Sequence, residues 1–118
     1  MKDLEDRLFN FSVNTLSLLK KIKFSDVNKV IVNQLAKSST SAGANYEESQ
    51  AGSSRADFIN KVNIALKEMR ESNYWLRIIK SIEIAPKEEI ESILKESDEL
   101  KKILAKILAK ILLKSRQS

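Results

Sequence analysis

The sequence lacks both cysteine and histidine. Without cysteine it forms no disulfide and no thiolate metal site, which fits a reducing, cytoplasmic environment. Without histidine it lacks the base of Ser-His and Cys-His nucleophiles and the usual ligands of zinc and di-iron sites. We therefore expect a protein that is not an enzyme and that has no metal and no cofactor.

Glycine and proline are also scarce, with two Gly and one Pro among 118 residues. Hydrophobic residues make up 42% of the chain and charged residues 31%, a balance that favours long helices over a turn-rich β fold. The first residues, MKDLEDRLFNF, are unlike a signal peptide, and no apolar run is long enough to span a membrane. The composition predicts one all-α domain, residues 1–118, in the cytoplasm and without a membrane partner.

Apolar residues recur at steps of three and four along four segments, which predicts four helices, at about residues 2–23, 26–51, 54–83 and 86–115. Ser25 or Asp26 is suited to cap the second helix and Ser54 the third, while Pro86 suits the first turn of the fourth. Four helices of similar length with short connections favour an antiparallel up-down four-helix bundle.

The helical period of these segments also predicts which side chains are buried. In the first, the expected inward residues are Leu4, Leu8, Phe11, Val13, Leu16, Leu19 and Ile22. In the third, Tyr74 and Trp75 extend the apolar face. Because aromatic residues at helical spacing usually fill cores, we interpret these two as core and rim packing rather than as groups that stack on bases.

The stretch KSSTSAGANYEESQAG, from Lys37 to Gly52, has the composition of a linker. The helical period nevertheless continues through it, and Gly43 costs a helix only about 1 kcal/mol relative to Ala. We predict helix to about Gln50. Small residues along this half of the helix indicate that a neighbour approaches closely, either another helix of the same chain or another subunit; the residues are Ser38, Ser41, Ala42 and Asn45.

Positive charge is concentrated in the fourth predicted helix. Residues 86–100 hold two Lys and six acids, net −4, whereas residues 101–118 hold five Lys, one Arg and no acid, net +6. A basic surface of this kind is typical of proteins that contact nucleic-acid phosphates, although a charge run is more often a solvated face. The candidate contacts are Lys20, Lys21, Lys23, Arg70, Arg77, Lys102, Lys106, Lys110 and Lys114.

Two pairs of acids offer an enzymatic alternative. Glu68 and Glu71, and likewise Glu88 and Glu91, are three residues apart and share a helix face. Carboxylates at this spacing hold magnesium in all-α nucleotide pyrophosphohydrolases. Such pairs also arise readily on charged helices, so surface ion pairing is the better interpretation.

The centre of the chain resembles a known family. QLAKSSTSAGANYEESQAGSSRADFINKVNIALKEMRESNYWLRII, residues 34–79, is similar to the four-helix-bundle family of 23S ribosomal RNA intervening-sequence proteins, which in turn resembles the accessory variability proteins of diversity-generating retroelements. The elements that carry the resemblance are Gln34-Leu35, Ser38, Ser41, Ala44-Asn45, Glu48, Asp57-Phe58, Ala65, Glu68 and Tyr74-Trp75-Leu76-Arg77.

This resemblance implies a protomer that assembles into a homopentameric ring, a basic surface that engages nucleic acid, and no established catalysis. Our leading hypothesis is a non-enzymatic homo-oligomer that binds structured RNA or DNA through basic surface residues. The alternative is a structural scaffold whose partner is another protein, with the lysine faces serving solubility. Magnesium-dependent nucleotide hydrolysis ranks third.

Overall fold

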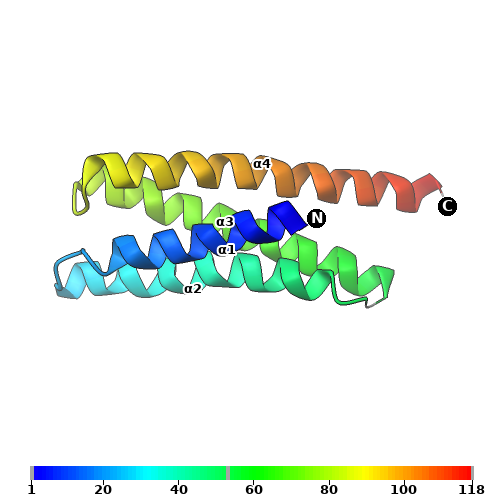
Figure 1. Cartoon of the computed structure of the whole chain (residues 1–118), viewed down its shortest axis with the longest axis horizontal. Coiled ribbons are helices and arrows are strands. Elements are labelled where there is room, and N and C mark those ends of the chain that lie inside the picture. The colour runs from blue at the N-terminus through cyan, green and yellow to red at the C-terminus, as the bar shows by residue number, and fades with distance from the viewer. Residues whose placement is uncertain (1, 53, 118) are drawn as a thin grey trace.

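The structure is a computed structural model that describes residues 2–52 and 54–117. It consists of four helices, and the described residues contain no strand (Figure 1). The helices are α1 (Lys2–Leu19), α2 (Asp26–Ser49), α3 (Arg55–Ile82) and α4 (Lys87–Gln117). They form an elongated bundle of 51 × 22 × 20 Å. The predicted all-α four-helix bundle is confirmed.

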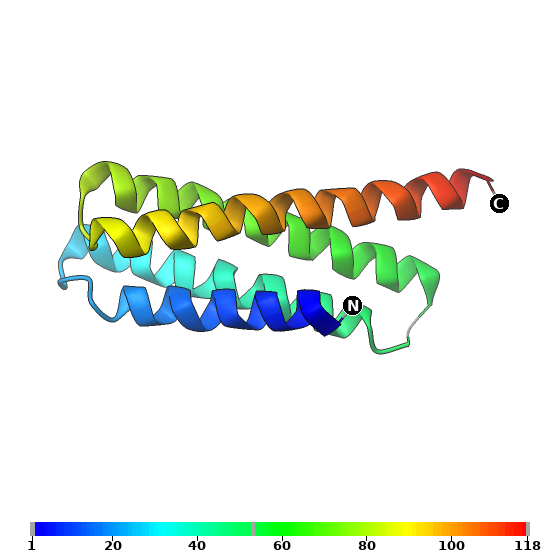
Figure 2. The same ribbon diagram turned by 45° about the horizontal axis from the view of Figure 1, so that its top comes forward.

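The four helices pack in a ring around the core, so that each helix contacts two others: α2 lies against α1 and α3, and α4 lies against α3 and α1. The α1–α2 and α3–α4 connections lie at one end of the bundle, and the α2–α3 connection lies at the other (Figures 1 and 2). With 18 residues, α1 is much shorter than the 31-residue α4. Figure 2 shows that the last turns of α4 extend past the other three helices.

Polar caps fix the start of two helices, as the sequence predicts. The Ser25 hydroxyl accepts a hydrogen bond from the Asn28 amide at 2.9 Å, and the Ser54 hydroxyl accepts one from the Asp57 amide at 3.1 Å. Both satisfy amide groups that a helix start leaves without an intrahelical partner. Pro86 directly precedes α4.

The end of α1 differs from the prediction. The helix stops at Leu19, whereas the pattern placed its end at Lys23. After Leu19 the chain tightens, because the Lys21 amide bonds the Leu18 carbonyl at 3.0 Å and the Ile22 amide bonds the Leu19 carbonyl at 3.2 Å. These bonds span three residues instead of four, so the chain winds more tightly than an α-helix as it enters the α1–α2 connection.

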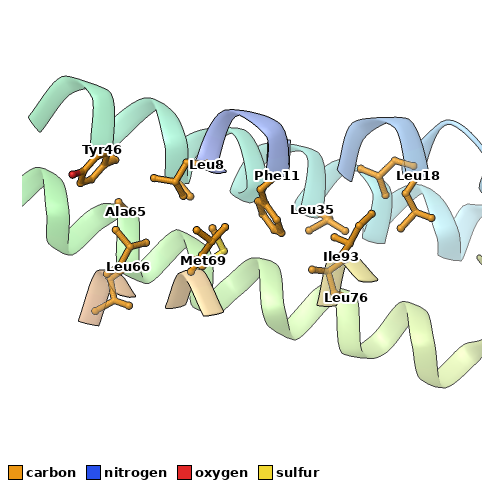
Figure 3. Packing of buried hydrophobic residues seen from close by; sticks show 14 of the residues in the cluster. Leu8, Phe11, Leu18, Leu35, Tyr46, Ala65, Leu66, Met69, Leu76 and Ile93 are labelled. Atoms are coloured by element: carbon orange, nitrogen blue, oxygen red, sulfur yellow. The ribbon is translucent and has the colours of Figure 1, made fainter. Parts of the chain in front are cut away.

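The core is a continuous apolar layer to which all four helices contribute. Figure 3 shows Leu8 and Phe11 of α1 pointing toward Met69 of α3, with Leu35 of α2 beside them. These four side chains are at most 2% exposed. The prediction for α1 was wrong at Val13 and Leu16, which are 43% and 39% exposed.

The exposure of Val13 and Leu16 follows from helix geometry. In a helix, a residue two positions from Phe11 is turned about 160° away from it, and a residue five positions away about 140°. Val13 and Leu16 therefore lie on the outer side of α1 together with Phe9, which is 61% exposed. The α1 outer face, defined as Phe9, Val13 and Leu16, is an apolar stripe at the surface.

Helix α2 continues without a break through the glycine- and serine-rich stretch, as predicted, and ends at Ser49. Gly43 lies against α1: a Cβ atom added to it would meet the Leu8 Cβ and carbonyl oxygen at 3.5 Å. Ser12 of α1 donates a hydrogen bond to the Ser39 carbonyl at 2.8 Å. Small side chains on α2 thus allow two helix backbones to approach closely. Gly52, with φ +81°, then turns the chain toward α3.

Candidate nucleic-acid interface

Helices α3 and α4 form a basic groove along their outer junction. It encloses about 420 Å³ and is lined by Arg70, Asn73, Arg77, Lys101, Lys102 and Ala105. Three of the predicted basic residues, Arg70, Arg77 and Lys102, are thereby brought together from two helices. We call this surface the α3/α4 groove.

A buried hydrogen-bond network holds the groove together at its centre. Asn73, which is 3% exposed, donates through Nδ2 to the Ser97 hydroxyl at 2.9 Å and to the Asp98 carboxylate at 2.8 Å. Its Oδ1 accepts a hydrogen bond from Arg77 Nε at 3.1 Å. Asn73 therefore ties α3 to α4 and orients the Arg77 guanidinium at the same time.

The cations of the groove exceed the acids that neutralise them. Lys101 Nζ lies 3.7 Å from the Asp98 carboxylate, which also accepts the Asn73 bond. Within residues 2–52 and 54–117, no carboxylate lies within 4 Å of the charged nitrogens of Arg70, Arg77 or Lys102. Cations held close together without counter-charges produce a positive potential that attracts anions.

Tyr74 contacts Arg77 of this groove, and the sequence interpretation missed this contact. Its side chain is 50% exposed, so it is not part of the core or its rim. The Arg77 guanidinium carbon lies 5.7 Å from the centre of the Tyr74 ring, within the range of a cation–π contact. Trp75, by contrast, is partly buried against the core, as expected. Adjacent residues in one aromatic pair thus face different environments.

The remaining lysines of α4 do not enter the groove as a group. Lys102, Lys106, Lys110 and Lys114 are exposed, and each step of four residues turns the stripe by about 40°. Lys114 is therefore turned about 120° from Lys102. The lysines therefore turn away from α3 and toward the side of α4 that faces α1. Nearer the start of α4, that side carries Glu96, which accepts a hydrogen bond from Arg7. Lys101, which sequence reasoning missed, lines the groove in their place; the Lys101-Lys102 doublet was its only signal.

The three lysines after α1 lie elsewhere, in the α1–α2 connection. Lys20 and Lys23 are exposed there. Lys21 Nζ pairs with the Glu89 carboxylate of α4 at 2.5 Å. Arg7 also pairs with α4, donating through Nε and Nη2 to both carboxylate oxygens of Glu96 at 3.0 and 2.6 Å. Arg7 of α1 and Lys21 of the α1–α2 connection thus pair with acids of α4, and we call this surface the α1/α4 seam.

The four small residues singled out on α2 divide into two pairs. Ser38 and Ala42 are fully buried inside the protomer, and the Ser38 hydroxyl lies 2.8 Å from the Ser72 hydroxyl of α3. Ser41 and Asn45 are partly exposed, with Asn45 Nδ2 donating to the Ser41 carbonyl at 2.9 Å and hydroxyl at 3.0 Å. The first pair therefore packs helices of one chain, and the second pair lies at the surface.

The acid pairs offer no assembled metal centre. The described residues contain no group of three or more acidic side chains placed to hold a metal ion. Burial raises the pKa of the Glu68 carboxyl, and the neighbouring negative charge of Glu71 raises it further. Lys67 and Lys37 act in the opposite direction. Within residues 2–52 and 54–117, no Lys or Arg nitrogen lies within 4 Å of the Glu68 or Glu71 carboxylate, so the ion pairing that the sequence favoured is not formed at this pair.

Comparison with known proteins gives the chain a family. A family model described as 23S rRNA-intervening sequence protein matches residues 4–106. No curated protein matches the chain. Within the described residues, no helix is long and apolar enough to cross a membrane.

One similar solved structure is the 1.70 Å crystal structure of a protein with unknown function from the S23 ribosomal protein family of Bacteroides thetaiotaomicron VPI-5482. It is 39% identical in sequence and superimposes with a TM-score of 0.79. The match covers 89% of this chain and 97% of that one. Neither description names a catalytic activity. The chain therefore belongs to the 23S rRNA-intervening sequence protein family.

Proposed function

We propose that this protein is a non-enzymatic, self-associating helical module that binds the phosphates of structured RNA or DNA in the α3/α4 groove. The observation that carries the proposal is the convergence of Arg70, Arg77, Lys101 and Lys102 on one groove. The α1/α4 seam has cations too, but Arg7 and Lys21 are neutralised there by carboxylates. In the groove, the charges of Arg70, Arg77 and Lys102 are available to a ligand, because no carboxylate of the described residues lies within 4 Å of them.

The chemistry of the groove suits the sugar–phosphate backbone. Arg77 uses Nε for Asn73 and keeps its two terminal amino groups for a ligand, since the described residues offer these groups no hydrogen-bond acceptor. Arginine forks match phosphate oxygens, and lysines add point charges. Contacts of this kind provide affinity without reading base sequence. The family is named for intervening sequences of 23S rRNA, which agrees with an RNA ligand.

Self-association is supported by apolar residues at the surface. Besides the α1 outer face, Val27 and Val30 of α2 are exposed apolar residues, at 67% and 56%. Exposed apolar groups that gather on one side of a protein often mark contacts with another protein. We expect antiparallel up-down protomers, in keeping with the alternating loop positions in Figure 1, to assemble into the homopentameric ring implied by the family resemblance. Ser41 and Asn45 stay candidates for that interface.

The test is a fluorescence-anisotropy titration of a labelled RNA hairpin and a labelled DNA duplex at several salt concentrations. We expect log affinity to fall linearly with log salt, because binding cations release counterions from phosphates. The groove variant Arg70→Gln/Lys102→Gln should reduce the slope by roughly two. Lys20→Gln/Lys23→Gln is the matched control, since it removes the same charge from exposed residues outside the groove.

Two outcomes would contradict the proposal. Equal loss of affinity in both double variants would mean that net charge, and not the groove, controls binding. No binding at low salt would favour the scaffold alternative, in which the apolar surface meets another protein. Native mass spectrometry tests self-association separately, and a mass equal to one chain would refute it.

A further inference from the structure

Tyr74 gives the α3/α4 groove a feature that phosphate binding alone does not use. Its ring is half exposed and stands one turn from both Arg70 and Arg77 on the outer side of α3. Arg77 lines the groove and also borders a second, smaller hollow of about 230 Å³, formed by Tyr74, Arg77, Ile78, Ser81 and Ile82. The larger hollow, the α3/α4 groove, is basic, whereas the smaller hollow is mainly aromatic and apolar.

We infer that this pair of hollows binds unpaired nucleotides, with the phosphates in the α3/α4 groove and a base stacked at Tyr74. The inference rests on the proposed function and names its ligand class. A base that is paired inside a helix presents only its edge to a protein, whereas an unpaired base offers its flat face for stacking. Loops and bulges of structured RNA or DNA supply such bases.

The arrangement of Arg77 supports this assignment. Its guanidinium is held between Asn73, which accepts its Nε–H, and the Tyr74 ring, whose centre lies 5.7 Å from the guanidinium carbon. A guanidinium in this position can donate to a phosphate and offer its own plane to a base. Because Asn73 is in turn bonded to Ser97 and Asp98 of α4, the binding geometry is largely set before a ligand arrives.

The smaller hollow has the composition expected for a base and not for a phosphate. Apart from Arg77, its lining consists of the Tyr74 ring, the aliphatic Ile78 and Ile82, and the Ser81 hydroxyl. Aromatic and apolar surfaces accept any of the bases, so the site would show little sequence preference.

The fluorescence of Trp75 should report the stacking of a base at Tyr74. Trp75 is the only tryptophan of the chain, and its ring lies edge-on to the Tyr74 ring with the centres 5.3 Å apart. A base that stacks at Tyr74 would change the surroundings of Trp75 directly. Intrinsic fluorescence therefore detects occupancy of this site and not of other basic surfaces.

The experiment compares a labelled 12-nucleotide oligothymidylate single strand with a 12-base-pair duplex, by anisotropy, and follows Trp75 emission with the unlabelled strands. Wild-type protein should bind the single strand more tightly, and only this strand should change Trp75 emission. Tyr74→Leu should weaken single-strand binding by about five- to a hundredfold and leave duplex binding unchanged, since stacking on one aromatic ring is worth that much per base.

Two variants control the interpretation. Tyr74→Phe keeps the ring and should bind the single strand within about twofold of wild type. Phe24→Leu removes an aromatic side chain that is 75% exposed in the α1–α2 connection and should have no effect.

Unchanged single-strand affinity in Tyr74→Leu, or unchanged Trp75 emission at saturation, would overturn the inference while leaving phosphate binding intact. Failure of wild type to bind either strand at low salt would overturn the proposed function as well.

Discussion

The two sides of α3 differ in almost every physical respect. Toward α2, small residues close the junction: Ser38, Ala42 and Ser72 are all fully buried, and the two serine hydroxyls lie 2.8 Å apart. Toward α4, long cationic side chains line a groove of about 420 Å³. One helix thus makes a junction of buried small residues on one side and lines a groove with exposed, charged side chains on the other.

This difference separates residues that stabilise the protomer from residues that are free to bind. Buried small residues allow close backbone approach and leave no room for larger side chains. Exposed cations contribute little to stability when they lack partners, and their charge is available to a ligand. Substitutions on the α2 side should therefore change stability, whereas substitutions on the α4 side should change binding.

The largest effect is expected on the closely packed side. Ala42→Leu would insert three carbon atoms at a fully buried position and should lower the free energy of unfolding by about 1–3 kcal/mol. Ala44→Leu is the matched control, because Ala44 is exposed on the same helix. Urea denaturation followed by circular dichroism measures both. Equal stability of the two variants would show that the α2/α3 junction is not closely packed.

A single added negative charge on α4 should show whether nucleic-acid binding depends on where a charge lies or only on the net charge. Ala105→Glu places a carboxylate in the groove and should weaken nucleic-acid binding by about tenfold, because it neutralises cations that contact phosphate. Ala109→Glu, one turn farther along α4 and exposed, changes the net charge equally outside the groove. Anisotropy titrations should show a much smaller loss for Ala109→Glu; similar losses would indicate that only net charge matters.

The smallest effect concerns Glu68, whose pKa is raised by burial and by Glu71. Because the folded state holds this proton more tightly than the unfolded state, the protein should lose stability as pH rises from the ordinary value of 4.5 through the raised pKa. Glu68→Gln cannot ionise and should lack this loss. Melting temperatures at pH 4 to 8 test it, with Glu91→Gln, an exposed carboxylate on α4, as the control. An identical pH profile for Glu68→Gln and wild type would contradict it.

Much of the fold could be predicted because it depends on local pattern. The helical period through Lys37 to Ser49 outweighed a linker-like composition, and Ser25 and Ser54 cap helices as their sequence context indicates. Val13 and Leu16 were misplaced because apolar character alone does not tell the inner from the outer side of a short helix. The end of α1 depends on tightening of its last turn, which the basic residues near Lys23 do not reveal.

Less of the candidate site than of the fold could be predicted from the sequence. Arg70, Arg77 and Lys102 were selected for their charge, but their convergence depends on the rotation of α4 against α3, which hydrogen bonds of Asn73 fix across the two helices. Regular spacing suggested one surface for Lys102 to Lys114, although a step of four residues winds around the helix. Tyr74 was assigned to packing because neither its exposure nor its contact with Arg77 is visible in the pattern.

The most direct test of the account is a nuclear magnetic resonance titration of ¹⁵N-labelled protein with an RNA hairpin, monitoring the arginine Nε–H signals and the Asn73 side-chain amide. We predict progressive shifts for Arg70, Arg77 and Asn73. Arg7, whose guanidinium is held by both oxygens of Glu96 in the α1/α4 seam, should stay unchanged as an internal control. Shifts at Arg7 without shifts at Arg70 and Arg77 would contradict the assignment of binding to the α3/α4 groove.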